Sequence, residues 1–83
     1  MANSIFTEEH RKFIAALRDV RLAAGVTQVE LSKRLGKNQS YISNLERCQR
    51  RLDVIEFTHI AVALRESPKA LFAQIITKAK IGG

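Results

Sequence analysis

The chain has 83 residues and a formal net charge of +6, and 46% of its residues are hydrophobic. This length holds a single domain, and its core is small enough for dimerisation to matter to stability. The one cysteine excludes an internal disulfide framework and fits a reducing compartment. The sequence has no secretory signal and no apolar run of membrane-spanning length, so we expect a cytoplasmic protein with no membrane partner.

The positive charge is concentrated in one stretch. Between Lys33 and Arg51 there are six lysines and arginines against one acidic residue, Glu46, so this stretch carries five of the six net charges. An ordinary solvated face is the alternative explanation. A polyanionic partner is favoured, because each phosphate contact releases counterions.

Local signals predict five helices, without repeats or linkers. Thr7 caps the first helix, which has two glutamates in its first turn, and Gly25 closes it. Residues 1–6 precede this helix as a flexible tail, from which Ile5 or Phe6 could pack beneath it.

The second and third helices are short and are joined by a tight turn. The second spans about 28–35 and is capped by Thr27, with Glu30 as the other half of a capping box. The third spans about 39–47 and is capped by Asn38. Its inner side is apolar, whereas its outer side carries amides and hydroxyls, which suit the edges of base pairs.

Two more helices follow. Asp53 caps the fourth, and Glu56 completes its capping box. Ser67 caps the fifth, with Pro68 as its first helical residue, and this helix is rich in apolar residues for a terminal helix. The domain therefore covers residues 7–77, followed by a fraying tail over residues 78–83. Part of the fifth helix should form the core and part should meet a second copy, through a dimer interface of Leu71, Phe72, Ile75 and Ile76.

The stretch Val26–Cys48, VTQVELSKRLGKNQSYISNLERC, resembles the helix-turn-helix of lambda-repressor-like (Cro/CI, Xre-type) DNA-binding domains. The resemblance continues through FTHIAVAL and SPKALF, and it covers about Arg11 to Ile76 in register. It implies an all-α fold, a compact five-helix lambda-repressor-like domain with a central helix-turn-helix. It also implies that the recognition helix, about 39–47, enters the major groove of double-stranded DNA.

The resemblance also assigns roles to residues. The base-reading positions are Gln39, Ser40, Ser43 and Asn44. The resemblance implies a phosphate contact at Gln28, and we also expect phosphate contacts from the polar and basic residues around the motif, Lys37, Asn38, Tyr41, Arg47, Arg50 and Arg51. In the family, an arginine of the first helix pairs with a glutamate late in the recognition helix, which matches Arg21 and Glu46. Cys48 stands where the family usually has glycine, so either it adopts a strained positive φ or the helix ends differently.

The leading hypothesis is a sequence-specific transcriptional regulator that binds a two-fold symmetric operator as a homodimer. It would repress when bound over a promoter; bound just upstream, it would place an exposed face against RNA polymerase and activate. No small-molecule ligand is expected. A phage-type repressor, an antitoxin and the controller protein of a restriction–modification system all fit this description. The alternative hypothesis is a protein-interaction module, such as an antitoxin that binds a partner protein through the apolar face of the fourth and fifth helices.

Other chemistry is poorly supported by the sequence. His10, His59 and Cys48 have no metal-ligand spacing. No nucleophile–base pair and no Gly-rich phosphate loop can be identified. We therefore expect no enzymatic activity, no metal and no cofactor.

Overall fold

The structure, a computed structural model, describes residues 6–82 and has only helices as regular elements over that range. The helices are α1 (Glu8–Ala23), α2 (Gln28–Arg34), α3 (Tyr41–Glu46), α4 (Val54–Ala63) and α5 (Pro68–Ala79). The all-α, five-helix prediction is confirmed. The expected flexible tail lies, except for its last residue, outside the described residues.

The predicted N-caps are present at four helices. The side chains of Thr7 and Ser67 each accept a hydrogen bond from the backbone N–H three residues later, and Asp53 forms the full capping box with Glu56. Thr27 accepts from the backbone N–H of Glu30 at 3.0 Å. The other half of that predicted box is replaced, because the carboxylate of Glu30 pairs with Arg34 one turn along the helix, at 3.2 Å.

Each helix is followed by a residue whose backbone has the left-handed, positive-φ conformation. These residues, with φ between 56° and 73°, are Gly25, Gly36, Cys48, Arg65 and Lys80. Such a residue turns the chain out of a helix, and glycine adopts this conformation without steric cost. Of the two alternatives for Cys48, the structure supports the strained positive φ.

The boundary predicted for the C-terminal tail is wrong by two residues. Helix α5 continues to Ala79, because Lys80 takes the left-handed cap conformation and the backbone N–H of Ile81 donates to the carbonyl of Ile76 at 3.1 Å. This bond is the one that closes a Schellman-type helix end. The first residues of the supposed tail are therefore helical.

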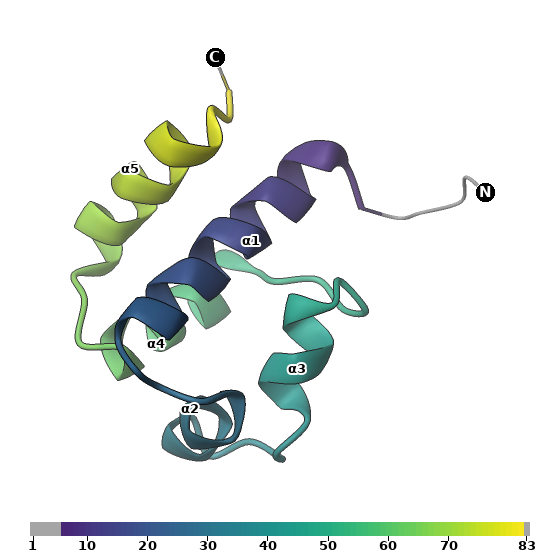
Figure 1. The fold of residues 1–83 in the computed structure, drawn as a ribbon, viewed down its shortest axis with the longest axis vertical. Coiled ribbons are helices and arrows are strands. Elements are labelled where there is room, and N and C mark those ends of the chain that lie inside the picture. Colours follow the sequence, from purple (N-terminus) through teal and green to yellow (C-terminus); the bar gives the residue numbers. More distant parts are fainter. Residues whose placement is uncertain (1–5, 83) are drawn as a thin grey trace.

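The five helices enclose one core. Helix α1 packs against α5 and α3, α4 packs against α5 and α2, and α2 packs against α3. Figure 1 shows α5 and α3 on opposite sides of α1. The buried apolar residues of the core come from all five helices and their connections, and are Ile14, Ala16, Leu17, Val26, Leu31, Ile42, Leu45, Phe57, Ile60, Ala61, Leu64, Leu71 and Ile75.

Helix α5 divides its apolar residues between two environments. Leu71 and Ile75 are each only 1% exposed and belong to the core, so the prediction that they line a dimer interface is wrong. They lie one turn apart on the side of α5 that meets the core. Phe72 remains 46% exposed, and Ile76 is half-buried. Of the four predicted interface residues, only these two have surface left for a partner.

Candidate nucleic-acid interface

The recognition helix α3 is held on the domain from its inner side. Ile42 and Leu45 are buried in the core. The hydroxyl of Ser32 in α2, which is fully buried, accepts a hydrogen bond from the backbone N–H of Ile42 at 3.1 Å. A small side chain is needed where α2 and α3 cross, and here the serine also satisfies an amide at the start of α3. These contacts fix how far α3 stands out from the domain.

Helix α3 begins two residues later than predicted. Gln39 and Ser40 form a turn before it, in which Asn38 Oδ1 accepts hydrogen bonds from the backbone N–H and the hydroxyl of Ser40, at 2.8 and 2.6 Å. Asn38 therefore acts as an Asx-type cap of this turn, and the helix proper starts at Tyr41. Gln39 and Ser40 are exposed at the tip of the motif.

The other two predicted base-reading residues are on α3 itself. Ser43 and Asn44 are half-exposed. Arg47 donates to Asn44 Oδ1 at 2.9 Å, which uses one acceptor site of the amide oxygen and leaves the NH₂ group available as a donor. The structure thus brings together Asn44, predicted to read bases, and Arg47, predicted to bind phosphate.

Arg21 and Glu46 form a buried ion pair that joins α1 to α3. Arg21 donates from Nε to Glu46 Oε2 at 2.7 Å and from Nη2 to Oε1 at 3.0 Å. Its third nitrogen donates to the carbonyl of Val26 at 2.8 Å. The two side chains are only 6% and 8% exposed. The geometry is bidentate, the strongest form of an arginine–carboxylate contact.

Gln28 belongs to the same network. Its amide donates to Glu46 Oε1 at 2.9 Å. The side chain was predicted to contact phosphate, and in the structure its NH₂ group is directed to the carboxylate, which leaves the amide oxygen as its other polar atom. Gln28 therefore helps to hold the end of α3 in place.

A second polar cluster, which we call the Tyr41–Arg50–Glu56 cluster, joins α3 to the start of α4. The hydroxyl of Tyr41 and the guanidinium of Arg50 both donate to Glu56 Oε2, at 3.1 and 2.7 Å. The guanidinium also lies 4.7 Å from the centre of the Tyr41 ring, a cation–π distance. The other oxygen of Glu56 accepts the backbone N–H of Asp53 at 3.1 Å.

The contacts in this cluster favour an ionised Glu56 carboxylate and a protonated Tyr41 hydroxyl. Desolvation alone would raise the pKa of Glu56, but the hydrogen bonds from Arg50, Asp53 and Tyr41 outweigh it, and the pKa lies below its usual value. Burial, followed by the nearby charge of Glu56, raises the pKa of Tyr41 against the opposing influence of Arg50. The phenol therefore stays protonated and can act as a donor.

The two remaining predicted phosphate contacts lie apart from each other. Lys37 is exposed, with its ammonium 5.5 Å from the centre of the Tyr41 ring. Arg51 instead lies 5.5 Å from the ring of Phe6, next to the first turn of α1. Arg51 thus faces the groove described below rather than the Tyr41–Arg50–Glu56 cluster.

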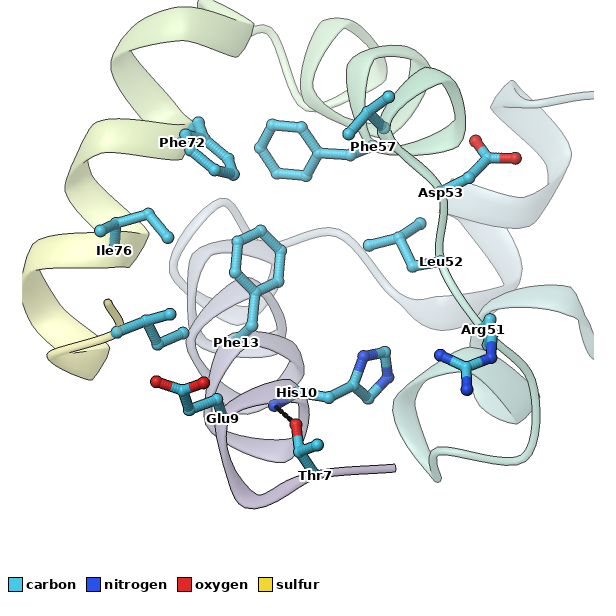
Figure 2. Close-up of a pocket in the computed structure, with 12 residues that line it drawn as sticks. Thr7, Glu9, His10, Phe13, Arg51, Leu52, Asp53, Phe57, Phe72 and Ile76 are labelled. Atoms are coloured by element: carbon cyan, nitrogen blue, oxygen red, sulfur yellow. Dashed lines mark hydrogen bonds between the residues drawn. The ribbon is translucent and has the colours of Figure 1, made fainter. Parts of the chain in front are cut away.

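A mostly apolar groove of about 390 Å³ opens between the start of α1, the start of α4 and α5. Figure 2 shows Phe13, Phe57 and Phe72 gathered in it, one from each helix. Their ring centroids are 5.5 to 5.9 Å apart, the spacing of packed aromatic pairs. His10 lies at the other end and stacks on Phe6. The groove is separate from α3.

Residues 6–82 lack both a candidate membrane-spanning helix and a cluster of metal-binding side chains. None of the helices there has the length and apolar character needed to cross a bilayer. Within the same residues, no three His, Cys, Asp or Glu side chains come together as they would around a metal ion.

The role of Glu56 was only half predicted from the sequence. The capping-box spacing identified its contact with Asp53, whereas its contacts with Tyr41 and Arg50 join residues 15 and 6 positions away. An acidic residue just after a basic stretch was the only available signal, and it does not name the partners.

Known proteins share the sequence pattern and the fold of this chain. A family model described as helix-turn-helix matches residues 17–71. A solved structure, an XRE-family like protein from Pseudomonas syringae pv. tomato str. DC3000, is 38% identical over 84% of this chain and 85% of that chain, with a TM-score of 0.77. No curated protein matches the chain significantly.

Proposed function

Since the chain belongs to the XRE-type helix-turn-helix family, whose members are DNA-binding regulators, we propose that it is a sequence-specific transcriptional regulator acting as a homodimer on a two-fold symmetric operator. One observation carries the proposal. Helix α3 is anchored in the core through Ile42 and Leu45, while its polar side and the preceding turn remain accessible. A side chain on such a helix can reach the base edges of the major groove.

The reading set consists of Gln39, Ser40, Ser43 and Asn44. Arg47 already donates one hydrogen bond to the oxygen of Asn44, whereas the NH₂ group of Asn44 is the group that the pair leaves for DNA, so this side chain would approach the bases mainly as a donor. The acceptors in the major groove are N7 and O6 of guanine, O4 of thymine and N7 of adenine. We therefore infer that Asn44 selects a base pair by donating from its amide to one of these atoms.

Phosphate contacts would position the domain. Lys37 and Arg47 are exposed beside the turn and the end of α3, and the hydroxyl of Tyr41 and the guanidinium of Arg50 lie nearby. Cations around a reading helix fix its register on the duplex without choosing the sequence. Arg51, which lies over the Phe6 ring, would add a contact farther from α3. DNA as the target implies a cytoplasmic location.

The dimer would form through the groove side of the domain. Phe72 and Ile76 border the groove on α5, and Val54 at the start of α4 is exposed next to it. A small domain gains stability when such apolar surface is covered by a second copy. A C₂ dimer carries two recognition helices, which would read half-sites about one helical turn apart.

Selection of bound duplexes from a random DNA library at physiological salt tests the proposal. We expect enrichment of a two-fold symmetric motif whose half-site centres are about ten base pairs apart. Salt-sensitive retention without any enriched sequence would contradict sequence-specific regulation, since it would mean that the positive surface binds DNA without reading it.

The same groove supports a second candidate function, a protein-interaction module that binds a different partner. Sedimentation of the purified protein separates the two candidates. A stable homodimer favours the regulator, because the groove is then occupied by a second copy. A monomer at all concentrations, together with weak DNA binding, favours the interaction module.

A further inference from the structure

We propose that Glu56 competes with the DNA backbone for Arg50 and Tyr41, and thereby limits how tightly the domain holds DNA. This inference rests on the proposed DNA-binding function and deepens it. Two side chains expected to contact phosphate direct donors at one carboxylate oxygen, at 2.7 and 3.1 Å. A phosphate oxygen is an anionic acceptor of the same kind, so DNA would offer these donors an equivalent partner.

The conformation of the Arg50 side chain would allow it to leave Glu56 for a DNA phosphate. Its Nη1 is buried and has no hydrogen-bond partner among the described residues, although Nη2 is bound to Glu56. An unpaired buried donor is unfavourable, and a charged one more so. A guanidinium that turned outward to a phosphate could satisfy this nitrogen. The side chain is 36% exposed, so the turn does not require opening the core.

Glu56 also has a structural role at the start of α4. Its other oxygen closes the capping box with Asp53, which stabilises the start of α4. Glutamine is also accepted at this capping-box position, so the cap alone does not require a charge. The negative charge next to Arg50 therefore has a separate effect, namely that it sets the balance between the internal ion pair and the phosphate contact.

Glu56→Gln tests the inference, with Asp53→Asn as the matched control. Both substitutions remove one negative charge from the start of α4, and both keep a residue that can cap the helix. Of these two carboxylates, Glu56 accepts hydrogen bonds from Arg50 and Tyr41, whereas Asp53 accepts from the backbone N–H of Glu56. Affinity for a short duplex of arbitrary sequence would be measured by fluorescence anisotropy over a range of salt concentrations.

We expect Glu56→Gln to bind more tightly than the wild type with little change in the salt dependence, because both proteins make the same phosphate contact once bound and only the wild type must first open the Arg50–Glu56 pair. Asp53→Asn should give a smaller gain and no change of slope. In an Arg50→Gln background, the gain from Glu56→Gln should shrink toward the small gain of Asp53→Asn. An equal gain from Asp53→Asn, a gain that survives Arg50→Gln undiminished, or weaker binding by Glu56→Gln would each overturn the inference.

A measurement on the wild-type protein completes the test. The NMR signals of the Glu56 carboxyl carbon and the Arg50 guanidinium should both shift when duplex is added, as the pair opens. Unchanged signals in a DNA-saturated sample would refute the competition. If no variant binds any duplex at low salt, the proposed function itself fails, which differs from every outcome above.

Discussion

Removal of Glu46 should destabilise the whole domain, because it leaves a buried cation without its partner. Glu46→Ala deletes the acceptor of two hydrogen bonds from Arg21 and one from Gln28. Arg21 then keeps only the carbonyl of Val26, at a position where 6% of its side chain is exposed. Breaking a buried pair in this way costs about 3–5 kcal/mol.

The size of this loss is large relative to the stability available. A domain of 83 residues is expected to be stable by about 4–12 kcal/mol. With a urea dependence of about 1.5 kcal/mol per molar, a loss of about 3 kcal/mol lowers the unfolding midpoint by about 2 M. Urea unfolding followed by circular dichroism at 25 °C measures the midpoint directly.

A double-mutant cycle separates the pair from its surroundings. Arg21→Ala, Glu46→Ala and the double variant should show a coupling of about 2 kcal/mol or more, because the second deletion removes a charge that the first left unpaired. The pair Lys78 and Asp19 provides the control, since its side chains are 58% and 51% exposed and an exposed pair contributes about 1 kcal/mol or less. Additive effects at Arg21 and Glu46 would refute the reasoning.

Further predictions concern base recognition, dimerisation, the backbone strain at Cys48 and the pH dependence of stability. Asn44→Ala should relax preference at one base position in selected DNA, and equal loss on every sequence would remove Asn44 from the reading set. Phe72→Glu should weaken dimerisation in sedimentation experiments, whereas the control Gln74→Glu, exposed elsewhere on α5, should not. Cys48→Gly should raise the free energy of unfolding by about 1 kcal/mol, because it removes the strain of a left-handed cysteine, and a lower stability would contradict this. Burial and the positive charges of Arg51 and Arg11 lower the pKa of His10 from its ordinary value of 6.5. On acidification the unfolded chain therefore takes up this proton at a higher pH than the folded protein does, so the free energy of unfolding should fall as the pH drops below 6.5. His10→Gln should reduce this fall in melting temperature between about pH 7.5 and about pH 5.5.

Sequence reasoning succeeded where the determining interactions are local. The caps at Thr7, Asp53 and Ser67 depend on a hydroxyl or carboxylate and an amide three residues away, so the pattern is visible in the chain itself. The family resemblance added the register of the recognition helix. The start of α3 was misplaced because the side chain of Asn38 binds the amide of Ser40 and forms a turn first.

Predictions failed or stayed incomplete where a residue's environment depends on distant elements. Leu71 and Ile75 lie on a helix with apolar residues on more than one side, and the sequence does not say which side meets the core. The same limit applies to Glu56, whose contact with Tyr41 depends on how α3 is oriented relative to the start of α4. Periodicity identifies an apolar helix, but burial of each side chain is decided by the packing of the other four helices.

The brevity of the recognition helix has a calorimetric consequence. Helix α3 has six residues, well below the roughly 12 that an isolated helix needs to be marginally stable in water. Its order comes from Ile42, Leu45 and the Ser32 hydroxyl, all in place before DNA arrives. Binding therefore includes no folding of this segment, and titration with an operator duplex at several temperatures should give a heat-capacity change that reflects the contact surface alone, without the larger negative value of coupled folding.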